Sequence, residues 1–291
     1  MDGIINVYKE KGYTSFDVVA RLRGILHQKK IGHTGTLDPD AEGVLPVCLG
    51  KATKLCEMLT DKDKVYEAVI KLGVRTDTQD ISGTVLGDKK YTGDADTIKK
   101  VIQSFQGDME QIPPMYSAVK VNGKKLYELA RKGITIERQP RKITVYDIKV
   151  VEINLDEGYV SIEACVSKGT YIRTLCEDIG KGLGCDACMA ALTRTRSGTF
   201  KIADSITLDG ISELIADNRL SEAVTDIDEV FAMPSVILKR EADRYLRNGN
   251  ELSPSMFDTI EDRTDNKTFI STGDNDICVY YSDRTFGAVY R

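Results

Sequence analysis

The sequence predicts an α+β protein, with one large domain of strands and helices followed by a small, mostly β region. Hydrophobic residues make up 41% of the 291 residues and charged residues 29%, so there is enough apolar material for a core. Helical spacing and strand alternation both occur along residues 1–201, whereas residues 233–291 read as short strands between turns. Because the apolar runs are only a few residues long, no membrane span is expected.

The first part of the chain gives clear signals for a helix and a strand. Thr14 and Ser15 can cap a helix whose apolar residues recur at helical spacing. A glycine-rich segment over residues 32–43 follows and leads into an apolar run. A strand is expected over residues 66–74, where apolar and charged side chains alternate.

The remaining elements are predicted in the same way. We expect, in order, a loop over 76–83, a short helix over 95–106, strands near 143–154 and 159–167, and a helix near 171–183 that ends at Gly184. Met233-Pro234 reads as a linker. The predicted division is therefore a domain over residues 1–230 and a second domain over residues 233–291.

Charge is distributed unevenly along the chain. The net charge is −5, yet residues 202–291 hold 9 Lys and Arg against 18 Asp and Glu, while residues 1–201 hold 31 against 27. Residues 114–149 alone carry nine Lys and Arg against three acids. A local basic surface on an acidic chain suits the recognition of phosphates over a limited footprint, although a solvated charged loop gives the same pattern.

The cysteine pattern favours a reduced, intracellular protein. Seven cysteines is an odd number, so a secreted disulfide framework is not expected. Cys185 and Cys188 form a CxxC without a second pair, and both histidines lie far away in sequence, so no metal site is expected. The N-terminal residues lack the pattern of a signal peptide, and a cytoplasmic location is expected.

Two charged residues are candidates for catalysis. Asp38 lies in the glycine-rich segment, and Pro39 restricts its backbone to extended conformations. A carboxylate on such a loop suits catalysis, but a turn or helix-capping Asp is the more common explanation, and Asp40 and Glu42 are rivals that spacing does not rank. Arg173 lies among apolar or small residues, where a buried guanidinium needs a carboxylate partner.

Taken together, the motifs resemble those of the TruB-type pseudouridine synthases. The central one is Gly-His-Thr-Gly-Thr-Leu-Asp-Pro at residues 32–39. The others follow in family order: Lys-Gly-Tyr-Thr-Ser at 11–15, Lys-Val-Tyr-Glu-Ala at 64–68, Leu-Gly-Val-Arg-Thr-Asp-Thr at 72–78, Pro-Pro-Met-Tyr-Ser-Ala-Val-Lys-Val-Asn-Gly at 113–123, Ser-Lys-Gly-Thr-Tyr-Ile-Arg at 167–173 and Leu-Thr-Arg at 192–194. The resemblance covers roughly residues 3–200, and the C-terminal region is loosely similar to the PUA domains appended to this family.

The resemblance implies a pseudouridine-synthase fold, in which helices flank a mixed, mainly antiparallel sheet, with a small PUA-like domain at the C-terminal end. It also implies an activity, the isomerisation of uridine 55 in the TΨC loop of tRNA to pseudouridine, without a cofactor or metal. The partner would then be the T arm and T loop of tRNA, and no obligatory protein partner or membrane is expected.

Roles for individual residues follow from the same resemblance. Asp38 would be the essential carboxylate, which attacks C1′ of the ribose or assists elimination to a glycal, and Arg173 would hold it by a bidentate contact. Tyr66 would stack on the flipped uracil and is a candidate for moving the proton from C5. The implied substrate contacts are Leu192 as an apolar wall, His33 filling the gap left in the RNA, Tyr171 shaping the pocket, Lys9 as the match to the first lysine of the family, and Lys120 within an RNA-clasping insertion over about 114–142.

Two other classes of function fit the residues without the resemblance. A nucleosidase or glycosidase could use Asp38 with Asp40 or Glu42, and it would release free base. An RNA-binding or RNA-folding protein would keep its affinity after Asp38 is removed. A guide-RNA-dependent relative is a further variant, although the additional partner-binding segments usual in such proteins are not found.

Overall fold

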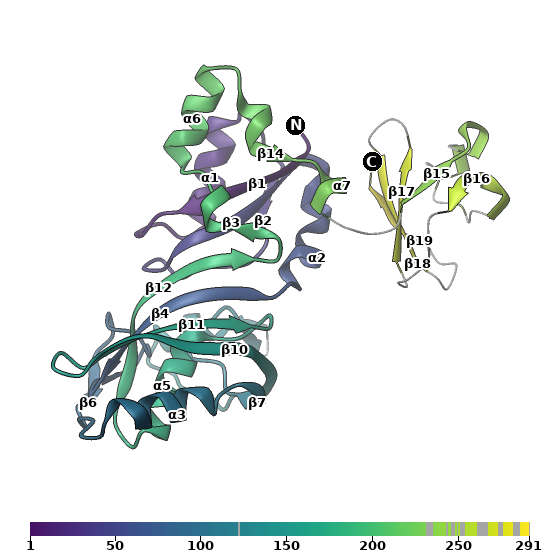
Figure 1. Ribbon diagram of the computed structural model, residues 1–291. Helices are drawn as coiled ribbons and strands as arrows, with labels where there is room; N and C mark the ends of the chain where they lie inside the picture. Colours follow the sequence, from purple (N-terminus) through teal and green to yellow (C-terminus); the bar gives the residue numbers. More distant parts are fainter. Residues whose placement is uncertain are drawn as a thin grey trace.

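The computed structural model has a large mixed sheet flanked by helices and a separate small sheet near the C-terminal end, so the predicted α+β fold class is confirmed (Figure 1). The predicted linker at Met233-Pro234 lies outside the described residues. The structure describes residues 1–121, 123–230, 235–242, 244–245, 248, 250, 254–260, 267–272, 276–281 and 286–290.

The large sheet has ten strands. Only the neighbours β3 and β12 run parallel among the described pairs of this sheet, so the prediction of a mixed, mainly antiparallel sheet is confirmed. The order across the sheet is β14 (Val224–Thr225), β1 (Gly3–Lys9), β3 (Glu42–Leu49), β12 (Ala187–Ser197), β4 (Lys64–Leu72), β11 (Tyr159–Val166), β10 (Arg141–Asn154) and β7 (Gly107–Gln111), with β13 (Phe200–Lys201) beside β12 and β2 (Ile31–His33) beside β3.

Helices cover this sheet in two groups. The upper group in Figure 1 packs on β1, β2 and β3, and the lower group packs beneath β4, β10, β11 and β12. The α-helices are α1 (Ser15–Ile25), α2 (Cys56–Thr60), α3 (Ala95–Gln103), α4 (Leu126–Ala130), α5 (Ile172–Gly182), α6 (Leu208–Ala216) and α7 (Ile227–Val230). Short 3-10 helices span Gly50–Leu55, Ile202–Asp204, Leu220–Ala223, Arg240–Ala242 and Pro254–Met256.

The local signals explain where these elements begin and end. The Thr14 hydroxyl accepts the N–H of Asp17 (3.0 Å), and the Asp17 carboxylate accepts the N–H of Thr14 (2.9 Å), so the predicted cap is a capping box. Helix α5 ends before Gly184, which has φ of +72° as the prediction requires. Strand β4 ends at Leu72, two residues earlier than predicted, because Gly73 turns the chain with φ of +80°.

Three small sheets complete the described fold. The predicted loop over 76–83 is the turn of a hairpin, β5 (Arg75–Thr76) with β6 (Val85–Gly87). A second hairpin, β8 (Lys120–Val121) with β9 (Lys124–Lys125), lies in the basic segment, whose residue Asn122 is outside the described part. The C-terminal sheet confirms the expected β-rich end, in the order β16 (Phe257–Ile260), β15 (Ser235–Leu238), β17 (Lys267–Thr272), β18 (Asp276–Tyr281) and β19 (Phe286–Tyr290).

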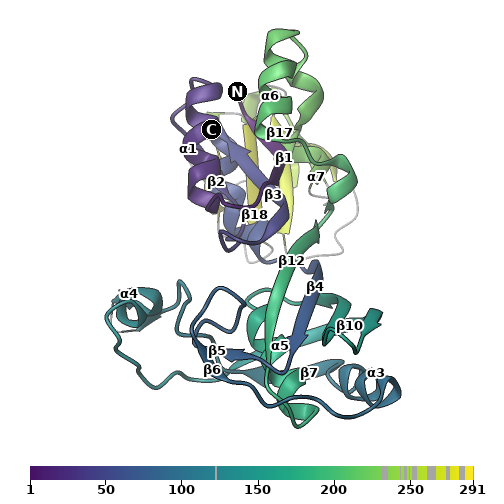
Figure 2. The same ribbon diagram turned by 90° about the vertical axis from the view of Figure 1, so that its left-hand side faces the viewer.

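Strand β12 joins the two halves of the large sheet, and β4 runs beside it in the lower half (Figure 2). Strand β12 meets β3 in parallel through only two pairs, Thr193 with Glu42 and Arg194 with Gly43. Because β3 begins at Glu42, the loop of residues 34–41 that precedes it must lie at this junction. The junction brings the predicted motifs at 32–39 and 192–194 side by side.

Candidate active site

The loop between β2 and β3 carries Asp38 and is held by both core packing and hydrogen bonds. Leu37 and Ala41 are buried in the core on either side of the acid. The N–H of Leu37 donates to Oγ of Ser15 (2.9 Å), and the Ser15 hydroxyl donates back to the Leu37 carbonyl (3.3 Å). The N–H of Ala41 donates to the Asp38 carbonyl (3.1 Å), which closes a turn over Pro39. The carboxylate of Asp38, 39% exposed, therefore projects from a fixed backbone.

Lys9 lies beneath this loop and has no exposed surface, which corrects its predicted contact with substrate. Its Nζ donates to the carbonyls of Ala41 (2.6 Å), Glu10 (3.1 Å) and Pro39 (3.2 Å). Burial lowers the pKa of Lys9 to about 8, against the opposing effect of nearby carboxylates, of which Asp38 acts most strongly. Because three carbonyls enclose the ammonium, Lys9 supports the loop rather than reaching a ligand.

Arg173, in the first turn of α5, holds Asp38 with two donors. Its Nε lies 2.8 Å from Oδ2 of Asp38, and its Nη2 donates to Oδ1 (3.3 Å). The guanidinium is buried, and its other donors reach the carbonyls of Thr78 (Nη1, 3.0 Å) and Tyr116 (Nη2, 2.8 Å). The structure thus brings the two predicted residues together. We call the two-point contact of Arg173 with Asp38 the fork, and the Thr78 and Tyr116 carbonyls fix the orientation of its guanidinium.

Asp80 is a second carboxylate at this guanidinium, and the sequence analysis missed it. Its Oδ2 lies 4.0 Å from Nη1 of Arg173. Its Oδ1 accepts from the Thr78 hydroxyl (2.8 Å) and from both the N–H (3.1 Å) and the hydroxyl (2.6 Å) of Ser82. An Asp followed two residues later by Ser is a typical Asx-turn signal, which could have marked Asp80 as a fixed side chain. Among the described carboxylates, those within 4.0 Å of Arg173 are Asp38 and Asp80, so the rivals Asp40 and Glu42 do not share the fork.

Tyr66 and Leu192 form an apolar wall on the sheet. Arg194 of β12 pairs with Tyr66 of β4, and Leu192 pairs with Ala68, so Tyr66 and Leu192 are diagonal neighbours on one face of the sheet. Both are 8% exposed and belong to the same core cluster as Leu37. The wall and Leu37, the residue before Asp38, therefore belong to one packed cluster.

His33 and Tyr171 lie at the edges of the same region. The N–H of Gly35 donates to Nδ1 of His33 (3.3 Å), and burial, helped by the charge of Arg194, lowers the pKa of this imidazole. Tyr171 precedes α5, and its N–H and carbonyl both bond the side chain of Gln111 (2.7 and 3.1 Å). Burial raises the pKa of the Tyr171 phenol. Both residues are half-buried.

Arg194 is a buried cation that the sequence analysis treated only as part of a motif. Its Nε donates to the carbonyl of Val44 (2.7 Å) and its Nη2 to that of Gly35 (3.3 Å). Gly43, with φ of +102°, permits the close approach of strand β12, because a Cβ there would lie 2.3 Å from the main-chain carbonyl oxygen of Arg194. Arg194 thus ties the start of the Asp38 loop to strand β12.

The basic segment over residues 114–142 forms the β8–β9 hairpin and α4. Leu126 buries its side chain, whereas Lys120, Lys124 and Lys132 are exposed. Cations lie over the ring of Tyr127, with Arg131 Cζ at 5.3 Å and Lys125 Nζ at 5.4 Å from its centroid. The carbonyl of Tyr116 links the segment to Arg173. A cationic, aromatic surface therefore borders the carboxylate.

Other candidate sites are weaker in the described part of the chain. Its His, Cys, Asp and Glu residues form no group of three or more that could hold a metal ion. Cys185 and Cys188 are both buried, and burial raises the pKa of Cys188 to about 11. None of its helices has the length and apolar character needed to span a bilayer.

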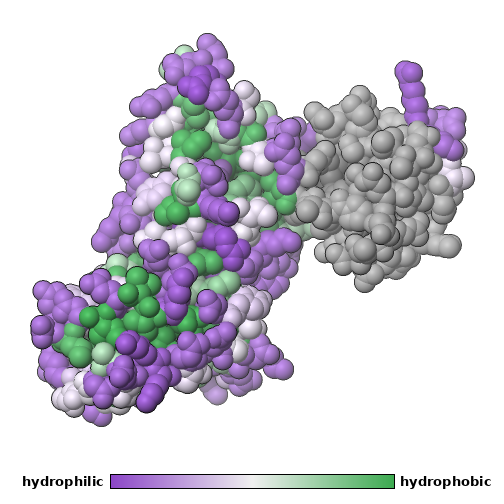
Figure 3. All heavy atoms as spheres, in the orientation of Figure 1, coloured by the Kyte–Doolittle hydropathy of each residue, from purple (hydrophilic) through white to green (hydrophobic). Residues whose placement is uncertain are grey.

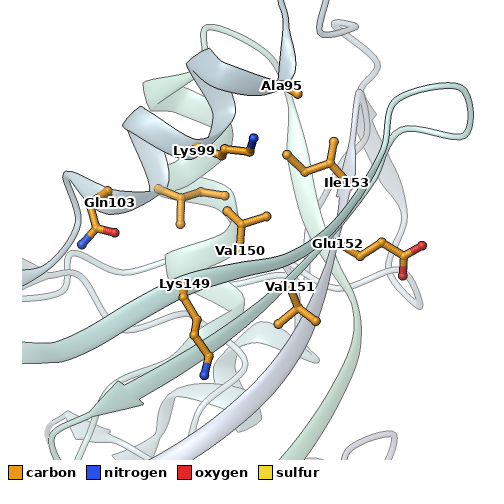
Figure 4. A pocket seen from close by; sticks show the side chains of 9 residues that line it. Ala95, Lys99, Gln103, Lys149, Val150, Val151, Glu152 and Ile153 are labelled. Atoms are coloured by element: carbon orange, nitrogen blue, oxygen red, sulfur yellow. The ribbon is translucent and has the colours of Figure 1, made fainter.

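A groove of about 510 Å³ lies between α3 and β10, and it shares no residue with the Asp38 region. Val150 and Ile153 point toward α3, whereas Lys149 and Val151 point away from it (Figure 4). Apolar residues gather on the molecular surface over the lower half, where β10 and β11 lie (Figure 3). Tyr146, Val151 and Leu155, on or beside β10, are large hydrophobic residues with exposed side chains.

The geometry can perform acid–base or nucleophilic chemistry on a substrate that carries phosphates. A half-exposed carboxylate, oriented by a buried guanidinium beside an apolar wall, is typical of an enzyme active site. Two family models match the chain: "TruB family pseudouridylate synthase (N terminal domain)" over residues 23–172 and "tRNA pseudouridylate synthase B C-terminal domain" over residues 173–238. The chain therefore belongs to the TruB family of pseudouridylate synthases.

Individual relatives agree with this assignment. The chain is 50% identical to the tRNA pseudouridine synthase B of Lachnoclostridium phytofermentans, over 100% of this chain and 95% of that protein. It is 46% identical to the tRNA pseudouridine synthase B of Clostridium kluyveri, over 90% of each.

Solved structures are also similar in fold. A chain of a Cbf5-Nop10-Gar1 complex has a TM-score of 0.74 and 30% identity, covering 99% of this chain and 85% of that one. A chain of an H/ACA RNP bound to a substrate RNA containing 2'-deoxyuridine has a TM-score of 0.72 and 28% identity, covering 99% and 83%. The predicted pseudouridine-synthase fold is thereby confirmed.

Proposed function

We propose that this protein converts uridine 55 in the T loop of tRNA to pseudouridine. The observation that carries the proposal is the two-point contact between Arg173 and Asp38, at 2.8 and 3.3 Å, beside the wall of Tyr66 and Leu192. The relatives at 46–50% identity are named for this class of reaction on tRNA, and they match the chain over nearly its whole length.

The reaction is an isomerisation in which every atom of the substrate is kept. The N1–C1′ bond of the nucleotide breaks, the uracil turns, and a C5–C1′ bond forms, while the proton on C5 is lost and N1 gains one. Asp38 either attacks C1′ or assists elimination to a glycal, and both routes need its carboxylate to be held at the sugar. Arg173 provides this orientation because two of its other N–H groups are held by the backbone carbonyls of Thr78 and Tyr116.

The remaining site residues act on the flipped base and on the RNA that it leaves. Tyr66 stacks on the uracil and is the candidate for moving the C5 proton, and Leu192 is the apolar surface on which the base turns. His33 fills the gap in the RNA; its lowered pKa favours a neutral ring, which suits stacking. Tyr171 shapes the pocket from the end of α5.

The tRNA is held through the basic segment over residues 114–142. Lys120, Lys124 and Lys132 contact phosphates there, and the segment folds over the T loop. We propose that the protein acts without a protein partner or guide RNA, since its relatives at 46–50% identity are tRNA enzymes while the H/ACA chain is 28% identical. A cytoplasmic location, a domain division near residues 230–233 and a PUA-like C-terminal domain accord with this role and stay predictions.

An assay with an unmodified tRNA transcript tests the proposal. Without added metal, the protein should form pseudouridine at position 55, and a transcript with cytidine there should give no product. Release of free uracil would indicate a nucleosidase instead. Binding without any product, unchanged by Asp38→Asn, would indicate an RNA-binding protein without this chemistry.

A further inference from the structure

Gln79, in the turn between β5 and β6, has an unusual backbone. Its φ is +63°, in the left-handed region that residues with a side chain rarely adopt. The other described non-glycine residues with positive φ, His27 and Asn218, each follow the end of a helix, where this conformation is common. Gln79 closes a turn in which its N–H donates to the Thr76 carbonyl (3.4 Å), and contacts made by its side chain and carbonyl hold it in this conformation.

Those contacts join the turn to two other elements. The hydroxyl of Thr174 donates to Oε1 of Gln79 (2.8 Å), and Nε2 of Gln79 donates to the carboxylate of Glu177. Thr174 and Glu177 are both on α5, on either side of one helical turn. The N–H of Met189, in β12, donates to the Gln79 carbonyl (3.0 Å). The side chain of Gln79 is thus hydrogen-bonded to α5, and its backbone carbonyl is hydrogen-bonded to β12.

Both sequence neighbours of Gln79 reach the same guanidinium. The Thr78 carbonyl accepts from Nη1 of Arg173 (3.0 Å), and Oδ2 of Asp80 lies 4.0 Å from that nitrogen. Arg173 is the residue immediately before Thr174 on α5. A change in the Gln79 backbone would therefore turn the Thr78 carbonyl and the Asp80 side chain away from Arg173 together.

We propose that Gln79 is a positioning residue for the reaction, whose amide locks the turn onto α5 and so aligns the fork of Arg173 on Asp38. This inference rests on the proposed function. An amide is required because the position needs an acceptor for Thr174 and a donor for Glu177 at once. Glu177 is prepared for this contact, since its Oε1 is held by Nζ of Lys181 (3.0 Å) and its Oε2 is left for Gln79.

Three variants test the side-chain amide of Gln79 separately from its strained backbone. Gln79→Gly relieves the backbone strain but removes the amide. Gln79→Glu removes the donor and sets two carboxylates against each other. Combining Gln79→Glu with Glu177→Gln restores a donor and an acceptor in exchanged places, and Lys181 keeps Asp178 as a partner (2.8 Å). Single-turnover rates, tRNA dissociation constants and thermal unfolding midpoints are measured for each.

The inference predicts a specific pattern in these measurements. The rate per folded molecule should fall by about ten- to a hundredfold in Gln79→Gly and in Gln79→Glu, as expected when a catalytic pair is displaced by about 1 Å. The dissociation constant for tRNA should change less than threefold, and the exchanged double variant should recover most of the rate.

The contrary outcomes are distinct. A wild-type rate in Gln79→Gly would overturn the inference, because the strained backbone and amide would then be dispensable. Failure of the exchanged pair to recover the rate, with a normal unfolding midpoint, would also overturn it. Absence of product from the wild-type protein would overturn the proposed function and this inference together, whereas wild-type activity with unaffected variants would overturn the inference alone.

Discussion

The Asp38 region and the basic segment of residues 114–142 border each other but are built in opposite ways. Around Asp38, buried side chains meet backbone carbonyls, and Arg173, Lys9 and Arg194 each donate to at least two of them. In the basic segment most cations are exposed. The Asp38 region holds a few atoms in fixed positions, whereas the basic segment presents positive charge over a wide exposed surface.

This contrast separates two kinds of mutational effect. In a buried network, removing one partner leaves another polar group unpaired and displaces neighbours, so the loss is large and not additive. On an exposed cationic surface, each phosphate contact adds a modest, salt-dependent contribution to affinity. Changes around Asp38 should therefore reduce turnover, and changes in the basic segment should reduce binding.

The largest effect is expected for Asp38→Asn. The two side chains are nearly isosteric, so the loop should fold and tRNA should bind with little change. Asn lacks the negative charge that either route of the reaction uses, so turnover should fall by about three orders of magnitude or more. Single-turnover formation of pseudouridine measures the loss, and filter binding measures the affinity.

Asp40→Asn and Glu42→Gln are the matched controls, because both acids lie within five residues of Asp38 and outside the fork of Arg173. They should retain turnover within a few-fold of the wild-type protein. An indispensable Asp40 or Glu42, with near-normal turnover in Asp38→Asn, would show that the catalytic carboxylate has been assigned wrongly.

A smaller loss is expected for Arg173→Lys. Lysine keeps the positive charge but cannot contact both oxygens of Asp38 while also bonding the Thr78 and Tyr116 carbonyls. Losing one or two charge-assisted hydrogen bonds should lower turnover by roughly ten- to a hundredfold. Arg219→Lys, at the exposed pair with Glu222, is the control and should leave turnover unchanged. Wild-type turnover in Arg173→Lys would mean that the planar contact does not position Asp38.

Most of the elements and the Asp38–Arg173 pair could be predicted from the sequence. Elements such as α1 and β4 follow from local signals, a capping Thr14 and an alternating pattern, which the chain carries within a few residues. The pairing of Asp38 with Arg173 came from the resemblance to a family, since residues 135 positions apart give no local signal. Lys9 was named as a substrate contact because it matches the first lysine of the family, and a motif match gives no information on burial.

The rest of the site depends on backbone atoms that a sequence does not display. Arg173 and Arg194 are directed by carbonyls of Thr78, Tyr116, Val44 and Gly35, and any residue type supplies a carbonyl. Asp80 matters only because the turn it occupies is folded against α5 and β12. Such contacts follow from the tertiary fold rather than from residue type.

The basic segment should respond to charge in the way that an exposed surface does. Replacing Lys124, Lys125 and Lys132 together by Gln should weaken tRNA binding. The dependence of log affinity on log salt should become shallower by about one unit or less for each phosphate that a lysine no longer neutralises. Turnover at saturating tRNA should stay close to normal.

A triple variant on another face distinguishes a local effect of the basic segment on tRNA binding from an effect of the overall charge. Lys99, Lys100 and Lys149 on α3 and β10 are exposed lysines, and their replacement by Gln should leave the salt slope unchanged. Equal slopes for the two triple variants would place the RNA contact elsewhere on the molecule.

Lys9 should make the free energy of unfolding depend on pH. Burial lowers its pKa in the folded protein to about 8 from the ordinary 10.5, so between these values the unfolded chain binds more protons. Stability contributed by Lys9 must then rise as pH increases from 8 to 10, by about 2 kcal/mol. Urea unfolding of wild type and Lys9→Met at both pH values measures this difference. As a control, Lys99→Met at an exposed site should change the free energy of unfolding by the same amount at both pH values. A Lys9 contribution that falls as pH rises would contradict the lowered pKa of a buried ammonium.

The smallest effect is expected for metal removal and for the CxxC cysteines. The proposed chemistry uses Asp38 and neither a metal nor a thiol, so EDTA should leave turnover unchanged. Cys185 lies in the apolar core cluster and Cys188 is also buried, so Ala is the suitable replacement because it introduces no new hydroxyl to be satisfied. The double variant Cys185→Ala, Cys188→Ala should lose some stability through its small cavities but keep its turnover per folded molecule. Turnover that falls with EDTA, and that added zinc restores in the wild type but not in the double variant, would show that these cysteines hold a metal needed for the reaction.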